Sequence, residues 1–152
     1  MTKWVLTAAF MAVAPLGLCH AGDRPKGKFA ELEGTWTIVK MEIDGRSLLE
    51  KGEKWKLVIK AGKVTASADG KNVQKGSLEL SKILDPGKKP KTVTVPYEGR
   101  VTFYGIYEVR GDRLLVCGDA VDPADEKNPE GRRPKKFDSK QGLLLVFKRS
   151  KK

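Results

Sequence analysis

The chain of 152 residues is 39% hydrophobic and 32% charged, and its 30 basic and 19 acidic side chains give a formal net charge of +11. This length supports one domain with a modest core. One histidine and two cysteines leave little for nucleophilic catalysis or zinc binding, and the basic excess favours anionic partners.

Residues 1–21 have the order of features that is typical of a secretory signal peptide. A positive start at Lys3 precedes an apolar run over residues 4–18, and small residues follow up to Ala21. We therefore expect cleavage after Ala21 and export of the protein to the periplasm, the cell surface or the extracellular space.

Two other interpretations of this segment are disfavoured. Pro15 and Gly17 interrupt the apolar run, which is also shorter than the roughly 20 residues that a transmembrane helix needs. Lipid attachment at Cys19 is disfavoured because Leu18 is too bulky for the position before a modified cysteine. The mature chain is expected to contain no transmembrane segment.

Cleavage would also remove the only histidine, His20, and one of the two cysteines, Cys19. The mature chain would then carry 29 basic and 19 acidic side chains, a net charge of +10, with Cys117 as its sole thiol. Without histidine it lacks Ser-His-Asp and Cys-His nucleophiles and zinc sites of Cys and His. We expect no metal, no cofactor and no internal disulfide.

The remaining chain reads as one domain of short strands. Residues 22–30 predict a flexible basic lead-in, residues 31–149 a single β domain, and residues 150–152 a basic tail. Turn residues recur at short intervals, and hydrophobic residues alternate between them. Eight strands are expected, over residues 35–43, 56–60, 63–68, 73–81, 93–95, 101–110, 113–118 and 143–149.

Two segments between the strands have other patterns. Residues 47–54 favour one helical turn, and residues 119–136 form a long polar loop. Gly76 lies where a β-bulge is expected. The strand pattern as a whole is typical of antiparallel sandwiches and barrels.

Period-two alternation within the strands also predicts which side chains share the interior. These are Trp36, Leu57, Ile59, Leu78, Leu80, Val93, Val95, Phe103, Tyr107, Val109, Leu114, Val116, Leu145 and Phe147. Val101 begins the clearest strand and has the same phase as Phe103 and Tyr107.

A series of short motifs runs in order along residues 30–149. It comprises Leu32-Glu33-Gly34-Thr35-Trp36, Glu42-Ile43-Asp44-Gly45-Arg46, Gly105-Ile106-Tyr107-Glu108-Val109, Gly111-Asp112 with residues 114–117, and Arg133-Pro134 with Phe137. The ordered set resembles a family of uncharacterised secreted domains that is abundant in planctomycete bacteria. That family is regarded as lipocalin-like, which implies a small eight-stranded antiparallel up-and-down barrel; a β-sandwich is the alternative. The resemblance brings no catalytic residues.

The Gly-x-Trp at the start of the first strand is also similar to the lipocalin signature. This resemblance implies that Trp36 plugs the closed end of the barrel, that Gly34 allows a close approach, and that Arg149 covers the indole. Trp36 and Arg149 are therefore expected to be neighbours. Small eight-stranded barrels are either filled or hollow; in a hollow one the ligand would contact Trp36, Phe103, Tyr107, Val109 and Phe147.

The basic excess is gathered in clusters that are candidates for an anion-binding surface. The candidates are Lys88, Lys89, Lys91, Arg132, Arg133, Lys135 and Lys136. A nucleic-acid partner is disfavoured, because the chain is expected to be exported and aromatic residues are not interleaved with the basic ones. The alternative is a solvated face whose lysines protect strand edges.

Cys117 and the acidic residues after it can be interpreted either as structural residues or as reactive or metal-binding ones. Cys117 is expected to be a small apolar strand residue, although nearby arginines would also suit a reactive thiol. The acidic residues between Asp119 and Glu130 are expected to form a solvated loop, because their spacing does not match a calcium-binding loop.

These observations favour an exported, non-enzymatic binding module. Its ligand would be a small apolar or amphipathic molecule inside the barrel, or an anionic polymer or surface at the basic side chains. The alternative is a structural or interaction domain with a filled core. A hydrolase that works through carboxylates is the third hypothesis, because fold alone does not determine activity.

Overall fold

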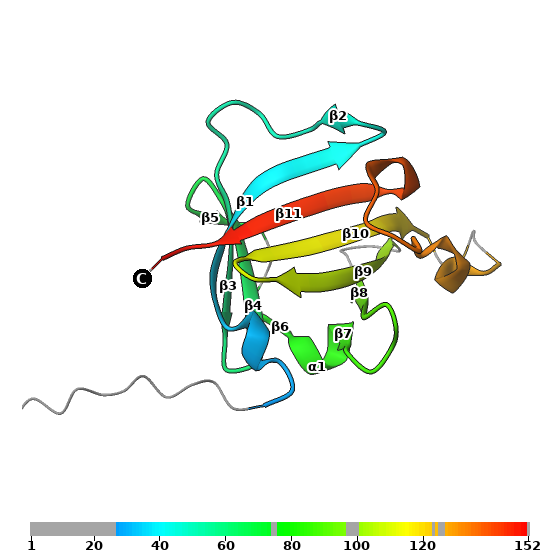
Figure 1. Ribbon diagram of the computed structural model, residues 1–152, viewed down its shortest axis with the longest axis horizontal. Coiled ribbons are helices and arrows are strands. Elements are labelled where there is room, and N and C mark those ends of the chain that lie inside the picture. Colours follow the sequence, from blue (N-terminus) through cyan, green and yellow to red (C-terminus); the bar gives the residue numbers. More distant parts are fainter. Residues whose placement is uncertain (1–26, 74–75, 97–100, 123, 125–126, 152) are drawn as a thin grey trace, which may run out of the picture.

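Antiparallel strands dominate the computed structural model of this chain (Figure 1). The structure describes residues 27–73, 76–96, 101–122, 124 and 127–151. The expected signal peptide (residues 1–21), residues 22–26 of the lead-in and Lys152 of the basic tail lie outside the described residues. Among the described residues, no helix is long and apolar enough to cross a membrane.

The strands are β1 (Gly34–Ile43), β2 (Arg46–Ser47), β3 (Trp55–Lys60), β4 (Lys63–Ala68), β5 (Lys71–Asn72), β6 (Leu78–Glu79), β7 (Leu84–Asp85), β8 (Thr92–Pro96), β9 (Thr102–Arg110), β10 (Arg113–Val121) and β11 (Leu143–Arg149). The helical segments are short: η1 (Ala30–Leu32), α1 (Leu80–Ile83), η2 (Pro129–Arg132) and η3 (Ser139–Gln141). The expected all-β class is therefore confirmed, whereas the expected count of eight strands is not observed.

The eleven strands of the described residues belong to one sheet in the order β5-β4-β3-β1-β11-β10-β9-β8-β7, with β2 paired to β1 and β6 to β4. The first and last long strands are neighbours and run antiparallel, with Trp36 opposite Arg149. Within the described residues no pairing joins the β4–β6 side to β7 or β8, so the sheet is not closed. The helical turn α1 connects its two sides (Figure 1).

The strand expected over residues 73–81 is mostly wrong. Among the residues of this range that the structure describes, only those of β6 pair with another strand, and the chain then turns into α1. Leu80 and Ile83 are both buried in the core, at 2% and 8% exposure. Residues three apart would face opposite sides of a strand but share one face of a helical turn. Gly76, where a bulge was expected, lies outside the strands with φ +76°.

Other local predictions are corrected in the same way. Residues 47–54 contain the end of β2 and a turn rather than a helical turn. The expected polar loop begins later, because β10 continues to Val121 alongside β9. Val101 precedes β9 and is 39% exposed, so it does not share the interior of that strand.

The predicted interior is confirmed. Each residue of the predicted set belongs to one hydrophobic cluster, either as a buried member or packed against it. The strand register explains this result, because Leu114 pairs with both Val109 and Phe147 and brings the inward positions of three strands together. The cluster also contains Leu32 of η1, and the Leu32 side chain is 2% exposed.

A second hydrophobic cluster lies on the opposite face of the same strands. Its buried members are Ile106, Cys117, Leu144 and Val146, and Leu115 and Phe137 pack against them. Phe137 comes from the segment between η2 and η3, so that segment covers part of the outer face of the sheet. The sequence pattern indicates a polar loop here and does not reveal this cover.

The apolar role expected for Cys117 is confirmed. Its side chain is fully buried, and its thiol donates a hydrogen bond to the carbonyl of Asp138 at 3.5 Å. Burial raises the pKa of the Cys117 thiol, so little of the nucleophilic thiolate is present near neutral pH.

Candidate functional site

The expected contact between Trp36 and Arg149 is present at the end of the sheet where η1 packs. Trp36 is fully buried and its indole N–H donates to the carbonyl of Leu32 at 2.8 Å. The guanidinium carbon of Arg149 lies 4.1 Å from the centre of the Trp36 ring. Such a contact stabilises by about 0.5 to 2 kcal/mol, more when water is excluded.

The guanidinium of Arg149 also ties the chain before β1 to the end of β11. It donates hydrogen bonds to the carbonyl oxygens of Glu33 and of Glu31, the latter at 2.6 Å. Gly34 has φ +128°, and a Cβ at this position would lie 3.2 Å from Arg149 Nη1. Gly34 thus makes room for the guanidinium rather than for the indole ring, and the three residues join the first and last long strands.

The five residues predicted to contact an interior ligand all belong to the main hydrophobic cluster or pack against it. Trp36, Tyr107 and Phe147 are at most 5% exposed, and Phe103 and Val109 pack against the cluster. None of them lines either of the two surface grooves described below.

The ring of Phe103 fills the interior over two glycines. A Cβ on Gly105 or on Gly118 would lie 2.7 Å from its Cε1 atom and 2.6 Å from a backbone carbonyl oxygen of the neighbouring strand. The inner face is therefore closely packed at this point.

Tyr107 is the polar exception inside the core. Its hydroxyl is buried and has no hydrogen-bond partner among the described residues. Burial first, and then the negative charges of Glu31 and Asp85, raise the pKa of Tyr107 from 10.0 to about 12. Lys91 lies 5.9 Å from the ring centre and 2.5 Å from the Glu31 carboxylate. Lys91 is therefore engaged in the fold and is a poor member of an anion-binding surface.

We expect Tyr107→Phe to raise the free energy of unfolding at pH 7 by about 1 kcal/mol, because it removes a buried hydroxyl that lacks a partner. The folded protein also keeps this proton when the unfolded chain has lost it. Wild-type stability is therefore fully present below pH 10 and falls as the pH rises toward 12. Urea unfolding of both proteins from pH 8 to 11 measures the two effects.

The difference in stability between Tyr107→Phe and the wild type should widen above pH 10, because the variant lacks the titrating group. A variant that is less stable than the wild type at pH 7 would contradict the prediction and would show that the hydroxyl has a stabilising partner in solution.

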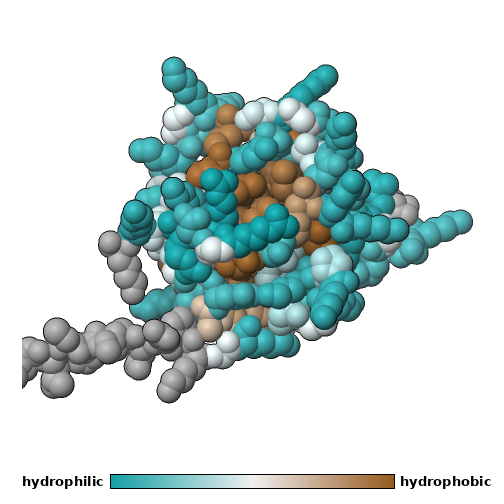
Figure 2. Space-filling view, viewed as in Figure 1, coloured by the Kyte–Doolittle hydropathy of each residue, from teal (hydrophilic) through white to brown (hydrophobic). Residues whose placement is uncertain are grey.

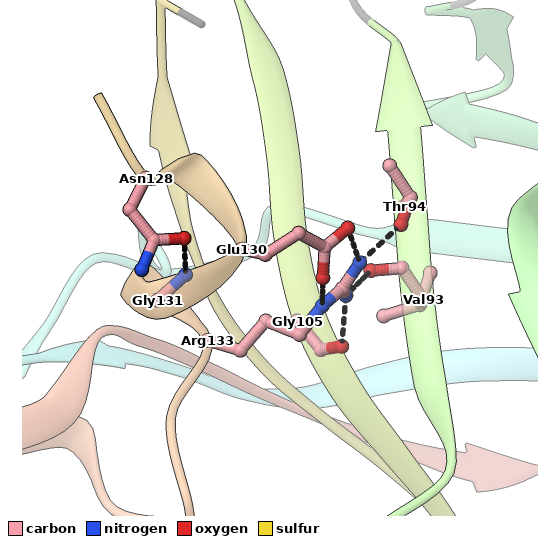
Figure 3. A network of polar contacts seen from close by, with 7 residues as sticks. All are labelled: Val93, Thr94, Gly105, Asn128, Glu130, Gly131 and Arg133. Atoms are coloured by element: carbon pink, nitrogen blue, oxygen red, sulfur yellow. Dashed lines mark hydrogen bonds and ion pairs between the residues drawn. The ribbon is translucent and has the colours of Figure 1, made fainter. Parts of the chain in front are cut away.

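A polar network on the outer face is centred on Arg133 (Figure 3). Its guanidinium reaches from the end of η2 to β8 and β9, where it donates to the carbonyls of Val93 and Gly105 at 2.6 and 2.8 Å and to the hydroxyl of Thr94 at 2.5 Å. Glu130 accepts two further hydrogen bonds, at 2.6 and 3.0 Å. The hydrogen bonds from Arg133 lower the pKa of Glu130, while partial burial opposes the change.

Arg133 is also one of the predicted anion-binding residues, and the structure gives its guanidinium acceptors within the protein. Its side chain is only 12% exposed, and its donors already serve protein acceptors. Its guanidinium also lies 5.3 Å from the centre of the Tyr104 ring. The arginine therefore fixes the segment after η2 to the sheet.

The remaining basic candidates are brought together only in part, at a groove of about 580 Å³ that is open to solvent. Residues at the ends of β1 and β10 form one wall, and the segment from η2 to β11 forms the other. The groove is lined by Ile43, Asp44, Asp119, Gly131, Arg132, Arg133, Pro134, Lys135, Lys140, Gln141 and Gly142.

Three exposed cations therefore face this groove: Arg132 and Lys135, which were predicted, and Lys140, which was not. In the part of the chain that the structure describes, the ammonium groups of Lys135 and Lys140 make no ion pair. Lys140 is an isolated basic residue in the sequence, so no cluster signal could have found it.

Lys88, Lys89 and Lys136 do not line the groove. Lys88 lies close enough to Glu130 for its charge to lower the pKa of that carboxyl. A second open groove, of about 350 Å³, lies beside α1, β7 and β8. It is lined by Lys28, Ser81, Lys82, Ile83, Leu84, Asp85, Thr92 and Thr94.

Hydrophobic side chains are also visible on the surface. Figure 2 shows them near the middle of the viewed face, surrounded by hydrophilic ones. The large hydrophobic residues that are most exposed come from several elements: Val39, Ile43, Leu48, Val58, Val73 and Val101. Single exposed hydrophobic residues are normal on protein surfaces, so these do not define a site.

The candidate functional site is thus the basic groove between the ends of β1 and β10 and the segment after η2. Comparison of the chain with protein-family models, with curated proteins and with solved structures gave no match.

Proposed function

We propose that the protein is an exported, non-enzymatic module that binds an anionic partner at the basic groove. The observation that carries this proposal is the presence of Lys135 and Lys140 beside Arg132 in one groove, with no ion pair to either ammonium group from the residues that the structure describes. The overall excess of basic side chains adds a long-range attraction for the same partners. The signal-peptide pattern of residues 1–21 supports export.

We further propose that the sheet is a lipocalin-like fold opened at one seam. The pairing of β1 with β11 and the stacking of Arg149 on Trp36 support this relationship. The opening lies between β6 and β7, where α1 provides the connection.

A surface ligand is favoured over an interior one because of how the core is packed. The Phe103 ring lies against Gly105 and Gly118, and Trp36 fills the end covered by Arg149. The same packing supports the second candidate, a structural or interaction domain with a filled core. The two candidates differ in whether the groove binds a charged partner.

Salt elution from an immobilised anionic polysaccharide, heparin, tests the proposal. Replacing Lys135 and Lys140 together by glutamine is expected to lower the salt concentration for elution, because fewer cations then contact the polymer. The wild-type interaction itself should weaken steeply with salt, since charges are screened beyond about 8 Å at physiological ionic strength.

The matched control replaces Lys56 and Lys60 by glutamine. Both are exposed on β3 and do not line the groove, and their loss changes the net charge equally. Equal elution shifts in the two double variants would show that only total charge matters and would contradict a binding groove. Retention that persists unchanged in roughly 1 M salt would contradict an electrostatic interaction altogether.

A further inference from the structure

The Asp119 side chain of the protein itself places a carboxylate in the basic groove. Asp119 Oδ2 accepts from Arg132 Nη2 at 2.8 Å, and both residues line the groove. The two side chains are 35% and 51% exposed, so solvent and solutes reach this ion pair. Asp119 therefore shows where a carboxylate fits beside the arginine.

The backbone on both sides of this carboxylate is held firmly. Asp119 lies within β10, where it pairs with Tyr104 of β9. Gly142 approaches the same point from the segment before β11, and a Cβ on Gly142 would lie 2.5 Å from the carbonyl oxygen of Gly118. The groove wall that carries Asp119 is thus formed by closely packed backbone, while the Asp119 and Arg132 side chains remain accessible.

We propose that Asp119 is a built-in competitor of the ligand, and that the ligand is a polysaccharide that carries carboxylates. A ligand carboxylate replaces the Asp119 carboxylate on Arg132, while Lys135 and Lys140 attract its neighbouring charges. This inference rests on the proposed function, because it concerns the occupant of the same groove.

The physical cost of the exchange is small. A solvent-exposed ion pair contributes little to stability, so the fold does not depend on the contact between Asp119 and Arg132. The guanidinium keeps a carboxylate partner after the exchange, and a planar guanidinium suits carboxylate geometry. The ligand also interacts with the ammonium groups of Lys135 and Lys140. In the part of the chain that the structure describes, Asp119 makes no ion pair with either lysine.

Asp119→Asn tests this inference, because it removes the competing charge and keeps the size of the side chain. The probe is an oligogalacturonate, and binding to the full chain is measured by titration calorimetry at low salt. We expect about a fivefold increase in affinity, the effect of one unit charge a few ångström away in water. The lysine double variant at positions 135 and 140 should bind more weakly than the wild type.

Asp112→Asn is the matched control, since Asp112 is an exposed turn residue that does not line the groove. Equal increases in the two asparagine variants would overturn the inference, because total charge would then explain them. No increase in Asp119→Asn, with weaker binding in the lysine double variant, would also overturn it while the proposed function stands. If neither oligogalacturonate nor heparin binds the wild type, the proposed function fails as well.

Two further probes separate the ligand classes. A heparin oligosaccharide carries mainly sulfates, and vesicles of phosphatidylglycerol present an anionic membrane. An increase in Asp119→Asn that is seen with oligogalacturonate and is weaker with these probes supports a carboxylated polysaccharide. A larger increase with either of the other probes would overturn that assignment.

Discussion

Trp36→Ala is expected to lower the free energy of unfolding by about 3 to 5 kcal/mol, the usual cost of truncating a buried aromatic side chain to alanine. Trp36 is fully buried, and the truncation leaves a cavity in the core. It also removes the hydrogen bond from the indole to the Leu32 carbonyl and the contact of the ring with the Arg149 guanidinium. Because domains of this size are stable by only about 5 to 15 kcal/mol, the variant should approach global instability. Urea unfolding followed by circular dichroism measures the loss.

A double-mutant cycle separates the ring contact from the packing of Trp36. Arg149→Ala removes the guanidinium above the ring and its hydrogen bonds to Glu31 and Glu33. We expect a coupling energy between Trp36 and Arg149 of about 0.5 to 2 kcal/mol. Strictly additive losses would contradict a direct interaction, and a loss below about 1 kcal/mol in Trp36→Ala would contradict its role in the core.

Arg133→Met is expected to lower the free energy of unfolding by about 2 to 4 kcal/mol, because hydrogen bonds from a charged donor to two strand carbonyls and a hydroxyl are lost together. Methionine keeps much of the length of the side chain, so the change is mainly one of hydrogen bonding. The segment after η2 should then detach from β8 and β9 more often than in the wild type.

Cys117 reports this detachment directly. It lies under the segment that contains Phe137 and donates to the Asp138 carbonyl. In a Cys19→Ser background it is the only thiol of the chain. We expect a thiol reagent to label Cys117 about 10 to 100 times faster in Arg133→Met, because local opening exposes it.

Arg132→Met is the matched control for this experiment. Arg132 is adjacent in sequence but 51% exposed, and exposed ion pairs contribute about 1 kcal/mol or less. Its labelling rate and stability should stay close to those of the wild type. Equal effects at positions 132 and 133 would contradict the assignment of the network to Arg133.

The residues of the candidate site could be predicted from the sequence only in part. Arg132 and Arg133 are indistinguishable by residue type and position in the chain, and both line the groove. Arg132 is 51% exposed there, whereas Arg133 is only 12% exposed and is held by the carbonyls of Val93 and Gly105. Their roles differ because a residue's burial depends on which distant strand it packs against. Lys140 is an isolated basic residue in the sequence and faces the groove only because η3 packs near the end of β1.

The sequence by itself determined the all-β class, most strand positions and the inward set of side chains, because alternation is a property of neighbouring residues. The resemblance of the Gly-x-Trp motif to the lipocalin signature implied that Trp36 and Arg149 meet, and the pairing of β1 with β11 places the two residues opposite each other. Only the tertiary structure decided that the sheet stays open between β6 and β7. Whether the two edge strands of the sheet pair depends on the twist and register of all the strands between them. These quantities accumulate over the whole sheet, so they cannot be predicted from any one segment of the sequence.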